Sequence, residues 1–221
     1  MTIIKICGIT TLGDGLLAAG VGADLLGINL FPPSPRFLKP PRARALADAL
    51  RAALGDSCPL LVGVFVNEDA ATVQRLMAEC ALDCAQLSGD EPPDVLAALA
   101  GRAFKSIRPR DAAEAETLAA AYLPGAPQDV RFPALLVDAY HATLYGGTGE
   151  LAGEAVARAA LAHTDRLMLA GGLTPDNVGA RIRAIRPWGV DVASGVEGDE
   201  PGRKDETCLR AFTAAVRVAA G

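Results

Sequence analysis

The sequence predicts a single-domain α/β protein built as a (β/α)8 barrel over residues 1–221. Short runs rich in Ile, Val and Leu alternate with stretches of helical periodicity, which is typical of βαβ units and a parallel sheet. Eight such runs and a closing helical stretch favour the barrel. A doubly wound sheet would show the same alternation with fewer strands. No Ser/Gly linker divides the chain, and 221 residues fit one such domain.

The expected strands are short and apolar because both faces of a barrel strand are buried. In chain order they are Ile3–Cys7, Leu25–Leu30, Leu60–Val66, Cys84–Leu87, Ala103–Ile107, Ala134–Asp138, Leu167–Ala170 and Gly189–Ala193. The Pro- and Gly-containing stretch from Leu123 to Asp129 is interpreted as a loop at the N-terminal face of the barrel, between the fifth helix and the sixth strand.

The stretches between the strands each carry one apolar stripe at helical spacing. Three stripes are clear: Val73 with Leu76, Met77 and Cys80; Val178 with Ile182 and Ile185; and Leu209 with Phe212 and Val216. Helices buried on one side, around strands buried on both, fit a closed barrel.

Composition excludes several classes of protein. The chain has 21 Lys and Arg against 26 Asp and Glu, a net charge of −5, and no basic run that would meet a phosphate backbone, so nucleic acid is not an expected partner. No apolar stretch is long enough to span a membrane, and the N-terminus does not resemble a signal peptide. We expect a soluble cytoplasmic protein; the sequence makes no prediction of its oligomeric state.

The cysteines are expected to be reduced thiols. There are five, an odd number without regular spacing, unlike a disulfide framework. Cys80 and Cys84 form a C-x3-C pair with no second pair, so ordinary core or surface thiols are favoured over a zinc site.

The carboxyl ends of the strands are where a barrel carries its chemistry. Gly171-Gly172 follows the seventh expected strand and Ser194-Gly195 the eighth; loops at these places commonly hold phosphate on backbone N–H groups, although such glycines also serve tight turns. The segment Gly146–Gly149 either adds donors, forms a lid, or is a flexible loop without a ligand role.

Three side chains at the same end are candidates for catalysis and binding. Asp138 ends an apolar run, where burial raises a carboxyl pKa toward that of a general acid; alone, it would equally fit a helix cap. Cys7 ends the first strand, where nearby donors would favour a thiolate base, although cysteine is usually a core residue. Arg36 follows a proline-rich turn and offers a fork for a substrate carboxylate, or is simply exposed.

These residues, in this order, resemble the phosphoribosylanthranilate isomerases over nearly the whole chain. The resembling segments are Lys5-Ile-Cys-Gly-Ile-Thr10, Gly22-Ala-Asp-Leu-Leu-Gly-Ile-Asn-Leu-Phe-Pro-Pro-Ser-Pro-Arg36, Val62-Gly-Val-Phe-Val-Asn67, Leu82-Asp-Cys-Ala-Gln-Leu87, Gly146-Gly-Thr-Gly149, Leu169-Ala-Gly-Gly-Leu-Thr-Pro-Asp-Asn177, Asp191-Val-Ala-Ser-Gly-Val-Glu197 and Gly202-Arg-Lys-Asp205. Each segment is weak alone, but eight in register are highly specific.

The resemblance implies an Amadori rearrangement of N-(5-phosphoribosyl)anthranilate, an aminoaldose, to an aminoketose, without cofactor or metal. On this basis Asp138 is the general acid and Cys7 the base. Arg36 matches the position associated with the anthranilate carboxylate, and Asp191 the position near the sugar hydroxyls. The positions that match the family's phosphate loops are Gly171, Gly172, Ser194 and Gly195.

The chain departs from the family pattern at two places. Ser88 stands where the family usually has the histidine of Gln-Leu-His-Gly, so a histidine role in that loop is absent. After Gly149 the family usually continues with an aromatic-Asp-Trp segment, whereas this chain has Glu150-Leu-Ala-Gly-Glu154, which bears on the packing of the following helix. Neither departure touches Cys7 or Asp138.

Three other functions compete. A metal-dependent sugar-phosphate epimerase needs converging histidine and carboxylate ligands, but only His141 lies near a strand end. An indole-forming synthase, the alternative enzyme, needs a lysine at the mouth; Lys105 lies in an expected strand, and no lysine replaces Cys7 and Asp138. A phosphosugar-binding protein without catalysis would need only the two phosphate loops.

Overall fold

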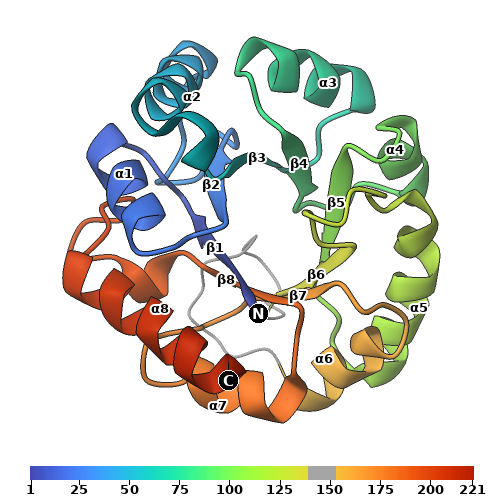
Figure 1. The fold of residues 1–221 in the computed structure, drawn as a ribbon. Helices are drawn as coiled ribbons and strands as arrows, with labels where there is room; N and C mark the ends of the chain where they lie inside the picture. The colour runs from blue at the N-terminus through green and yellow to red at the C-terminus, as the bar shows by residue number, and fades with distance from the viewer. Residues whose placement is uncertain (139–152) are drawn as a thin grey trace.

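Eight parallel strands form a closed barrel in the computed structural model, which describes residues 1–138 and 153–221. The strands follow one another around the barrel in chain order, and β1 closes the ring by pairing with β8. Figure 1 shows the helices surrounding this ring. The predicted single-domain (β/α)8 barrel is confirmed.

The strands are β1 Ile3–Cys7, β2 Leu25–Asn29, β3 Leu60–Phe65, β4 Cys84–Leu87, β5 Ala103–Ile107, β6 Leu135–Val137, β7 Leu167–Leu169 and β8 Gly189–Val192. The predicted bounds of β1, β4 and β5 are confirmed, and the other five strands are shorter by one or two residues than predicted. The residues lost from the ends include Asp138 and Ala193, which begin the loops at the mouth of the barrel.

The helices are α1 Leu12–Gly20, α2 Pro40–Leu54, α3 Ala70–Glu79, α4 Pro93–Ala98, α5 Ala112–Tyr122, α6 Glu154–Leu161, α7 Val178–Ile185 and α8 Glu206–Ala220, with short 3-10 turns at η1 Gly55–Ser57, η2 Leu123–Gly125 and η3 Ser194–Val196. Side chains start four of the α-helices by accepting a backbone N–H bond: those of Thr11, Asp69, Asp111 and Asp205. The three predicted apolar stripes, on α3, α7 and α8, face the sheet.

The interior of the barrel is apolar in its N-terminal half. Successive residues of a strand point to opposite faces, so alternate residues fill the interior while their neighbours pack under the helices. The interior cluster contains Leu25, Val62, Cys84, Phe104, Leu136 and Met168. Phe132, from the loop before β6, joins this cluster, and Arg166 holds that loop by donating to the carbonyl oxygens of Pro127, Asp129 and Phe132.

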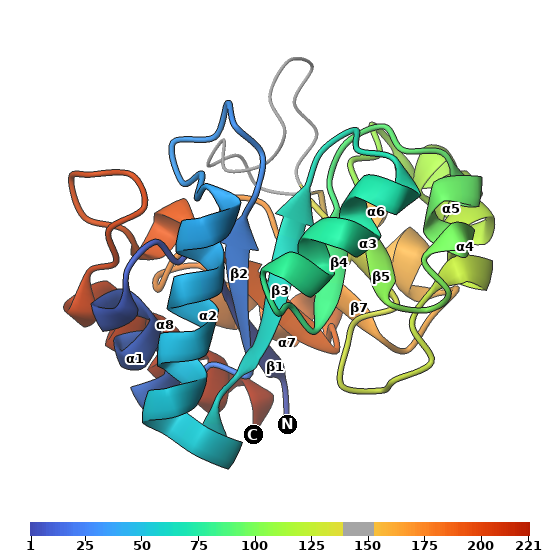
Figure 2. The same ribbon diagram turned by 90° about the horizontal axis from the view of Figure 1, so that it is seen from above.

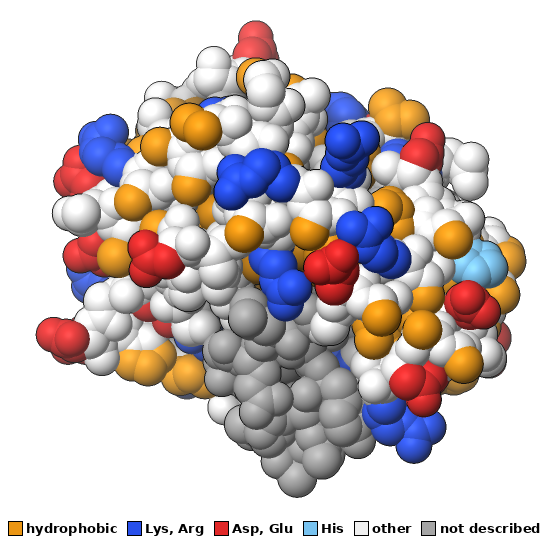
Figure 3. Space-filling model, turned by 90° about the horizontal axis from the view of Figure 1, so that it is seen from below, with side chains coloured by type: hydrophobic (Ala, Val, Ile, Leu, Met, Phe, Trp, Pro, Cys, Tyr) orange, Lys and Arg blue, Asp and Glu red, His pale blue; other side chains and the backbone are white. Residues whose placement is uncertain are grey.

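The other end of the barrel carries the loops that follow the strands, among them the long segment between β2 and α2 (Figure 2). In the face shown in Figure 3, basic, acidic and apolar side chains are interspersed. Within the described part of the chain, no helix combines the length and the apolar character needed to cross a membrane.

Candidate active site

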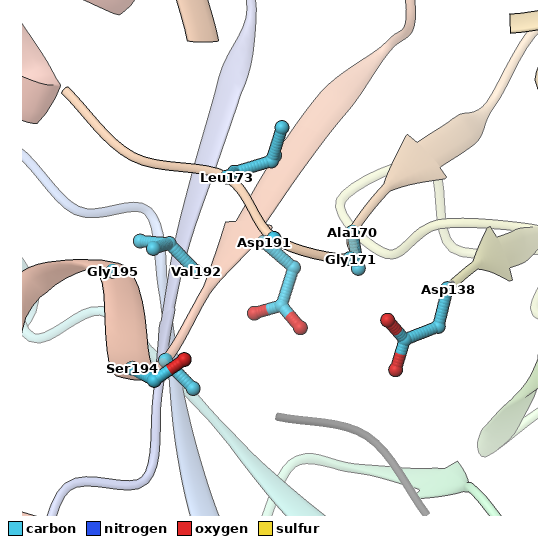
Figure 4. Close-up of a pocket in the computed structure, with 10 residues that line it drawn as sticks. Asp138, Ala170, Gly171, Leu173, Asp191, Val192, Ser194 and Gly195 are labelled. Carbon is cyan, nitrogen blue, oxygen red and sulfur yellow. The ribbon is translucent and has the colours of Figure 1, made fainter. Parts of the chain in front are cut away.

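A pocket opens at the carboxyl ends of β6, β7 and β8. Its lining residues are Asp138, Ala170, Gly171, Gly172, Leu173, Asp191, Val192, Ala193, Ser194 and Gly195. Figure 4 shows the carboxylates of Asp138 and Asp191 directed into the same space from opposite sides. Five of the six predicted binding residues, together with the predicted acid, therefore meet at one place.

The glycines let the backbones of the two phosphate loops come close together. Gly171 and Gly172 have φ values of +86° and +63°, a left-handed conformation that favours glycine. A Cβ on Gly195 would lie 1.9 Å from the carbonyl oxygen of Leu173, so no larger residue fits there unless the backbone moves. Within the described residues, no carbonyl accepts the N–H of Gly172, Ser194 or Gly195, and these donors remain for an anion.

Asp138 is placed by the end of the sheet. Its N–H donates to the carbonyl oxygen of Ile107 over 3.0 Å, which continues the β5–β6 ladder by one bond. The carboxylate is partly buried and faces the pocket. The N-cap of α6, the next helix that the structure describes, is Gly153, so Asp138 does not cap it.

Cys7 lies beside this pocket at the end of β1, with 9% of its surface exposed. Gly27 is its partner on β2, and a Cβ on Gly27 would lie 2.7 Å from the Cys7 Sγ, so the glycine leaves the space that the thiol occupies. Burial raises the pKa of the Cys7 thiol, and Asp191 adds to this rise, whereas Lys5 and Lys204 oppose it. A base at this position therefore depends on its cationic neighbours.

Lys5 and Asp191 form a buried ion pair inside the barrel. They are direct partners in the β1–β8 ladder, and Lys5 Nζ lies 2.9 Å from Asp191 Oδ1. The Lys5 side chain is fully buried. Burial lowers the pKa of Lys5, but Asp191 and Cys7 outweigh burial and raise the pKa above its ordinary value. We call Lys5, Cys7 and Asp191 the inner cluster.

Arg36 lies between the mouth and the segment that follows η3. Its Nε and Nη2 donate to the two carboxylate oxygens of Glu197 over 2.7 and 2.6 Å, and Lys204 Nζ lies 2.9 Å from Glu197 Oε1. The Arg36 side chain is 13% exposed, so the alternative of a solvent-exposed arginine is wrong. No described residue accepts a bond from Nη1 of Arg36, and this group remains for a ligand.

Gln86 and Ser88 occupy the opposite side of the mouth, on β4 and just after it. Gln86 Nε2 donates to Ser88 Oγ over 3.0 Å, and both residues are buried. Gln86 Oε1 is buried and makes no hydrogen bond with the described residues. The serine that replaces the expected histidine thus holds the amide of Gln86.

A second buried ion pair lies outside the barrel. Lys105 Nζ lies 2.5 Å from Glu91 Oε2 and donates to the carbonyl oxygen of Gly89 over 2.6 Å. Tyr122 of α5 donates its hydroxyl to the carbonyl oxygen of Glu91 over 2.7 Å. Because Phe104 fills the interior, the alternation of β5 directs Lys105 toward the helices. Lys105 is therefore not the mouth lysine of an indole-forming synthase. We call Glu91, Lys105 and Tyr122 the outer cluster.

The sequence interpretation did not assign roles to Lys5, Glu197, Lys204 or Gln86. For Lys5 a signal was present, because a lysine two residues before Cys7 in a buried strand shares its face. No pattern pairs Glu197 with Arg36, since these residues are 161 positions apart. His141 and the segment Gly146–Gly149 lie outside the described residues, as do residues 150–152 of the departing segment.

The family model of N-(5'-phosphoribosyl)anthranilate (PRA) isomerase matches residues 4–215. The N-(5'-phosphoribosyl)anthranilate isomerase of Roseiflexus sp. (strain RS-1) is 44% identical over 221 residues, covering 98% of each chain. That of Trichlorobacter lovleyi is 40% identical over 211 residues, covering 95% of each chain.

Two solved structures are also similar. Phosphoribosyl anthranilate isomerase from Thermus thermophilus has a TM-score of 0.82 and 38% identity, covering 98% of this chain and 99% of that chain. A phosphoribosyl anthranilate isomerase in complex with reduced 1-(o-carboxyphenylamino)-1-deoxyribulose 5-phosphate has a TM-score of 0.78 and 31% identity, covering 99% of this chain and 100% of that chain.

Proposed function

Because the chain belongs to the N-(5'-phosphoribosyl)anthranilate isomerase family, it catalyses the isomerase step of tryptophan biosynthesis, and we propose that Asp138 and Cys7 are the acid and the base of that step. The observation that carries the proposal is the pocket in which Asp138 and Asp191 face the two phosphate loops. A phosphate held there brings the attached sugar between the two carboxylates.

The substrate has three recognition points. Its phosphate binds the free backbone N–H groups of Gly172, Ser194 and Gly195, with Gly171 shaping the loop. Its carboxylate binds Arg36, whose Nη1 has no partner within the described residues and whose other nitrogens are held rigidly by Glu197. The sugar hydroxyls lie near Asp191. The neighbour complexed with a reduced carboxyphenylamino deoxyribulose phosphate supports a ligand of this shape.

Asp138 starts the reaction by opening the sugar ring. Its proton passes to the ring oxygen as the bond between that oxygen and C1 breaks, and the nitrogen lone pair forms a protonated Schiff base at C1. The Asp138 carboxyl group is partly buried and lines the pocket, so it lies within reach of a sugar bound there.

Cys7 completes the rearrangement. Its thiolate takes the C2 proton, and the electron pair of the broken C–H bond forms the C1–C2 double bond of an enolamine while the nitrogen becomes neutral. The enolamine then gains a proton at C1 and loses the proton of its C2 hydroxyl, which gives the ketone. The cationic Schiff base acidifies the C2 proton and attracts the thiolate in the same step.

We also propose that the protein works in the cytoplasm on this small phosphosugar and not on nucleic acid. All five cysteines are unpaired thiols, which a reducing compartment maintains, and the base requires one of them free. The acidic excess of the sequence and the mixed charges in Figure 3 favour a small anionic substrate held locally over an extended phosphate backbone.

The test is loss of anthranilate-type fluorescence when freshly generated phosphoribosylanthranilate is added to the protein, followed for the wild type and for Cys7→Ser. Serine is almost never ionised at neutral pH, so we expect kcat of Cys7→Ser, per mole of folded protein, to fall at least ~100-fold. Near-normal kcat with a lowered melting temperature would instead identify Cys7 as a core residue only.

A further inference from the structure

Two ammonium groups approach the Cys7 thiol from different parts of the barrel. Lys5 precedes Cys7 by two residues on β1, so both side chains project from the same face of that strand into the barrel. Lys204 comes from the segment before α8, and its Nζ donates to the carbonyl oxygen of Ala193 over 3.0 Å. Since Val192 pairs with Ile6, the next residue, Ala193, lies beside Cys7.

Neither lysine is free to swing toward solvent. Both side chains are completely buried. Asp191 holds the ammonium group of Lys5 at 2.9 Å, and Glu197 holds that of Lys204 at the same distance. The thiol therefore faces fixed charges, which cost no reorganisation when the thiolate forms.

The charges of the two ion-pair networks beside the thiol do not cancel. Three cations, Lys5, Arg36 and Lys204, stand against two carboxylates, Asp191 and Glu197, so this group of side chains has one positive charge in excess. A negative charge that forms at Cys7 is therefore stabilised by this excess. Asp138 also faces the mouth, from the β6 side of the pocket.

We propose that Lys5 and Lys204 are positioning residues that stabilise the thiolate of Cys7, the form that takes the C2 proton. The inference rests on the proposed role of Cys7. An opposite charge nearby favours the ionised form of a thiol, and both lysines act against the effect of burial on the pKa of Cys7. Asp191 acts in the opposite sense, because its negative charge disfavours a second anion.

Lys5 is not itself the base. A general base must be neutral before it takes a proton, and the pKa of Lys5 is raised above its ordinary value, so its neutral form is rare at neutral pH. Its contribution to the reaction passes through the charge that it presents to Cys7.

The experiment titrates the Cys7 thiol without substrate, by the pH dependence of its alkylation by iodoacetamide. Cys58 and Cys208 are partly exposed and also react, so peptide mass spectrometry follows the Cys7 peptide alone. We expect Lys204→Met and Lys5→Met each to raise the thiol pKa by about one unit or more, and Asp191→Asn to lower it. The rising limb of kcat/KM against pH should move in the same directions.

Lys5→Met and Asp191→Asn each remove one half of the same ion pair, and we expect them to shift the thiol pKa in opposite directions. A purely structural role would not give this result, because general loosening of the site would shift the thiol pKa in the same direction in both variants. If Lys5→Met does not fold, Lys5→Met/Asp191→Asn replaces it. The thiol pKa of this double variant should exceed that of Asp191→Asn. Lys105→Met is the matched control, since it removes an equally buried lysine that faces the helices, and it should leave the Cys7 titration unchanged.

An unchanged thiol pKa of Cys7 in Lys204→Met and in the double variant would overturn the inference. So would a Lys204→Met variant in which only KM rises, because Lys204 would then serve only to support Glu197. The proposed function fails separately: near-normal kcat in Cys7→Ser would remove the role of Cys7 as base whatever the titration gives.

Discussion

The inner and outer clusters contain the same chemistry in two different settings. Each has a strand lysine paired with a buried carboxylate: Lys5 with Asp191 at 2.9 Å, and Lys105 with Glu91 at 2.5 Å. The inner pair lies beside the pocket and a thiol. The outer pair is closed in by backbone: Glu91 Oε1 accepts the N–H groups of Asn67 and Gly89, which ties together the loops after β3 and β4.

The pKa values of the two lysines differ accordingly. Burial is the largest influence on both, but Asp191 and Cys7 raise the pKa of Lys5 above its ordinary value, whereas the pKa of Lys105 stays below it despite Glu91. A buried ion pair therefore does not by itself mark a catalytic site. What distinguishes the inner pair is that a thiol and a pocket adjoin it.

The largest expected effect is the loss of turnover when Asp138, at the mouth of the barrel, is replaced. Asp138→Asn keeps the shape of the side chain but not its proton, so kcat should fall by about 10²–10⁴-fold while the melting temperature stays near that of the wild type. Steady-state kinetics of the folded variant measure this. Wild-type turnover in Asp138→Asn would assign ring opening to another proton source.

The outer cluster should respond in stability instead. Lys105→Met leaves the carboxylate of Glu91 buried without its cation, so the free energy of unfolding should fall by about 3–5 kcal/mol. Urea unfolding measures the loss, and kcat per mole of folded protein should not change. A large fall in kcat with unchanged stability would mean that the outer cluster also acts in catalysis.

Replacing Arg36 tests whether its ion pair with Glu197 serves substrate binding. Lysine keeps the charge but lacks the planar fork, so Arg36→Lys should raise KM about tenfold with a smaller change in kcat. An unchanged KM with the natural substrate would place the carboxylate partner elsewhere in the mouth.

The smallest effect is a pH dependence of stability at Glu197. Burial raises the pKa of this carboxyl, but Arg36 and Lys204 outweigh burial and hold the pKa below its ordinary value of 4.5. The stability that ionised Glu197 adds to the folded protein is therefore fully present above pH 4.5, and it is lost as the pH falls through the lower pKa of the folded state. The difference in free energy of unfolding between wild type and Glu197→Gln should shrink over this range. A constant difference would contradict the assignment.

Much of the architecture was predictable because burial on both faces leaves a strong apolar signal. The eight strands, the three clear helical stripes and the residues at the mouth all follow from that signal and from the rule that chemistry gathers at the carboxyl ends of barrel strands. The strand ends could not be predicted to the residue, as at Asp138, since an apolar run does not indicate where the last ladder bond is made.

The sequence alone determined the fold, the family and the order in which the mouth residues occur, because periodicity and local motifs carry that information. Only the tertiary structure decided which charges meet. Closure of the barrel brings Asp191 beside Lys5, 186 residues away in the chain, and brings Glu197 against Arg36. The alternation of strand faces then separates Lys5, inside the barrel, from Lys105, under the helices. Ion pairing depends on distances of a few ångströms, and strand closure and register set those distances.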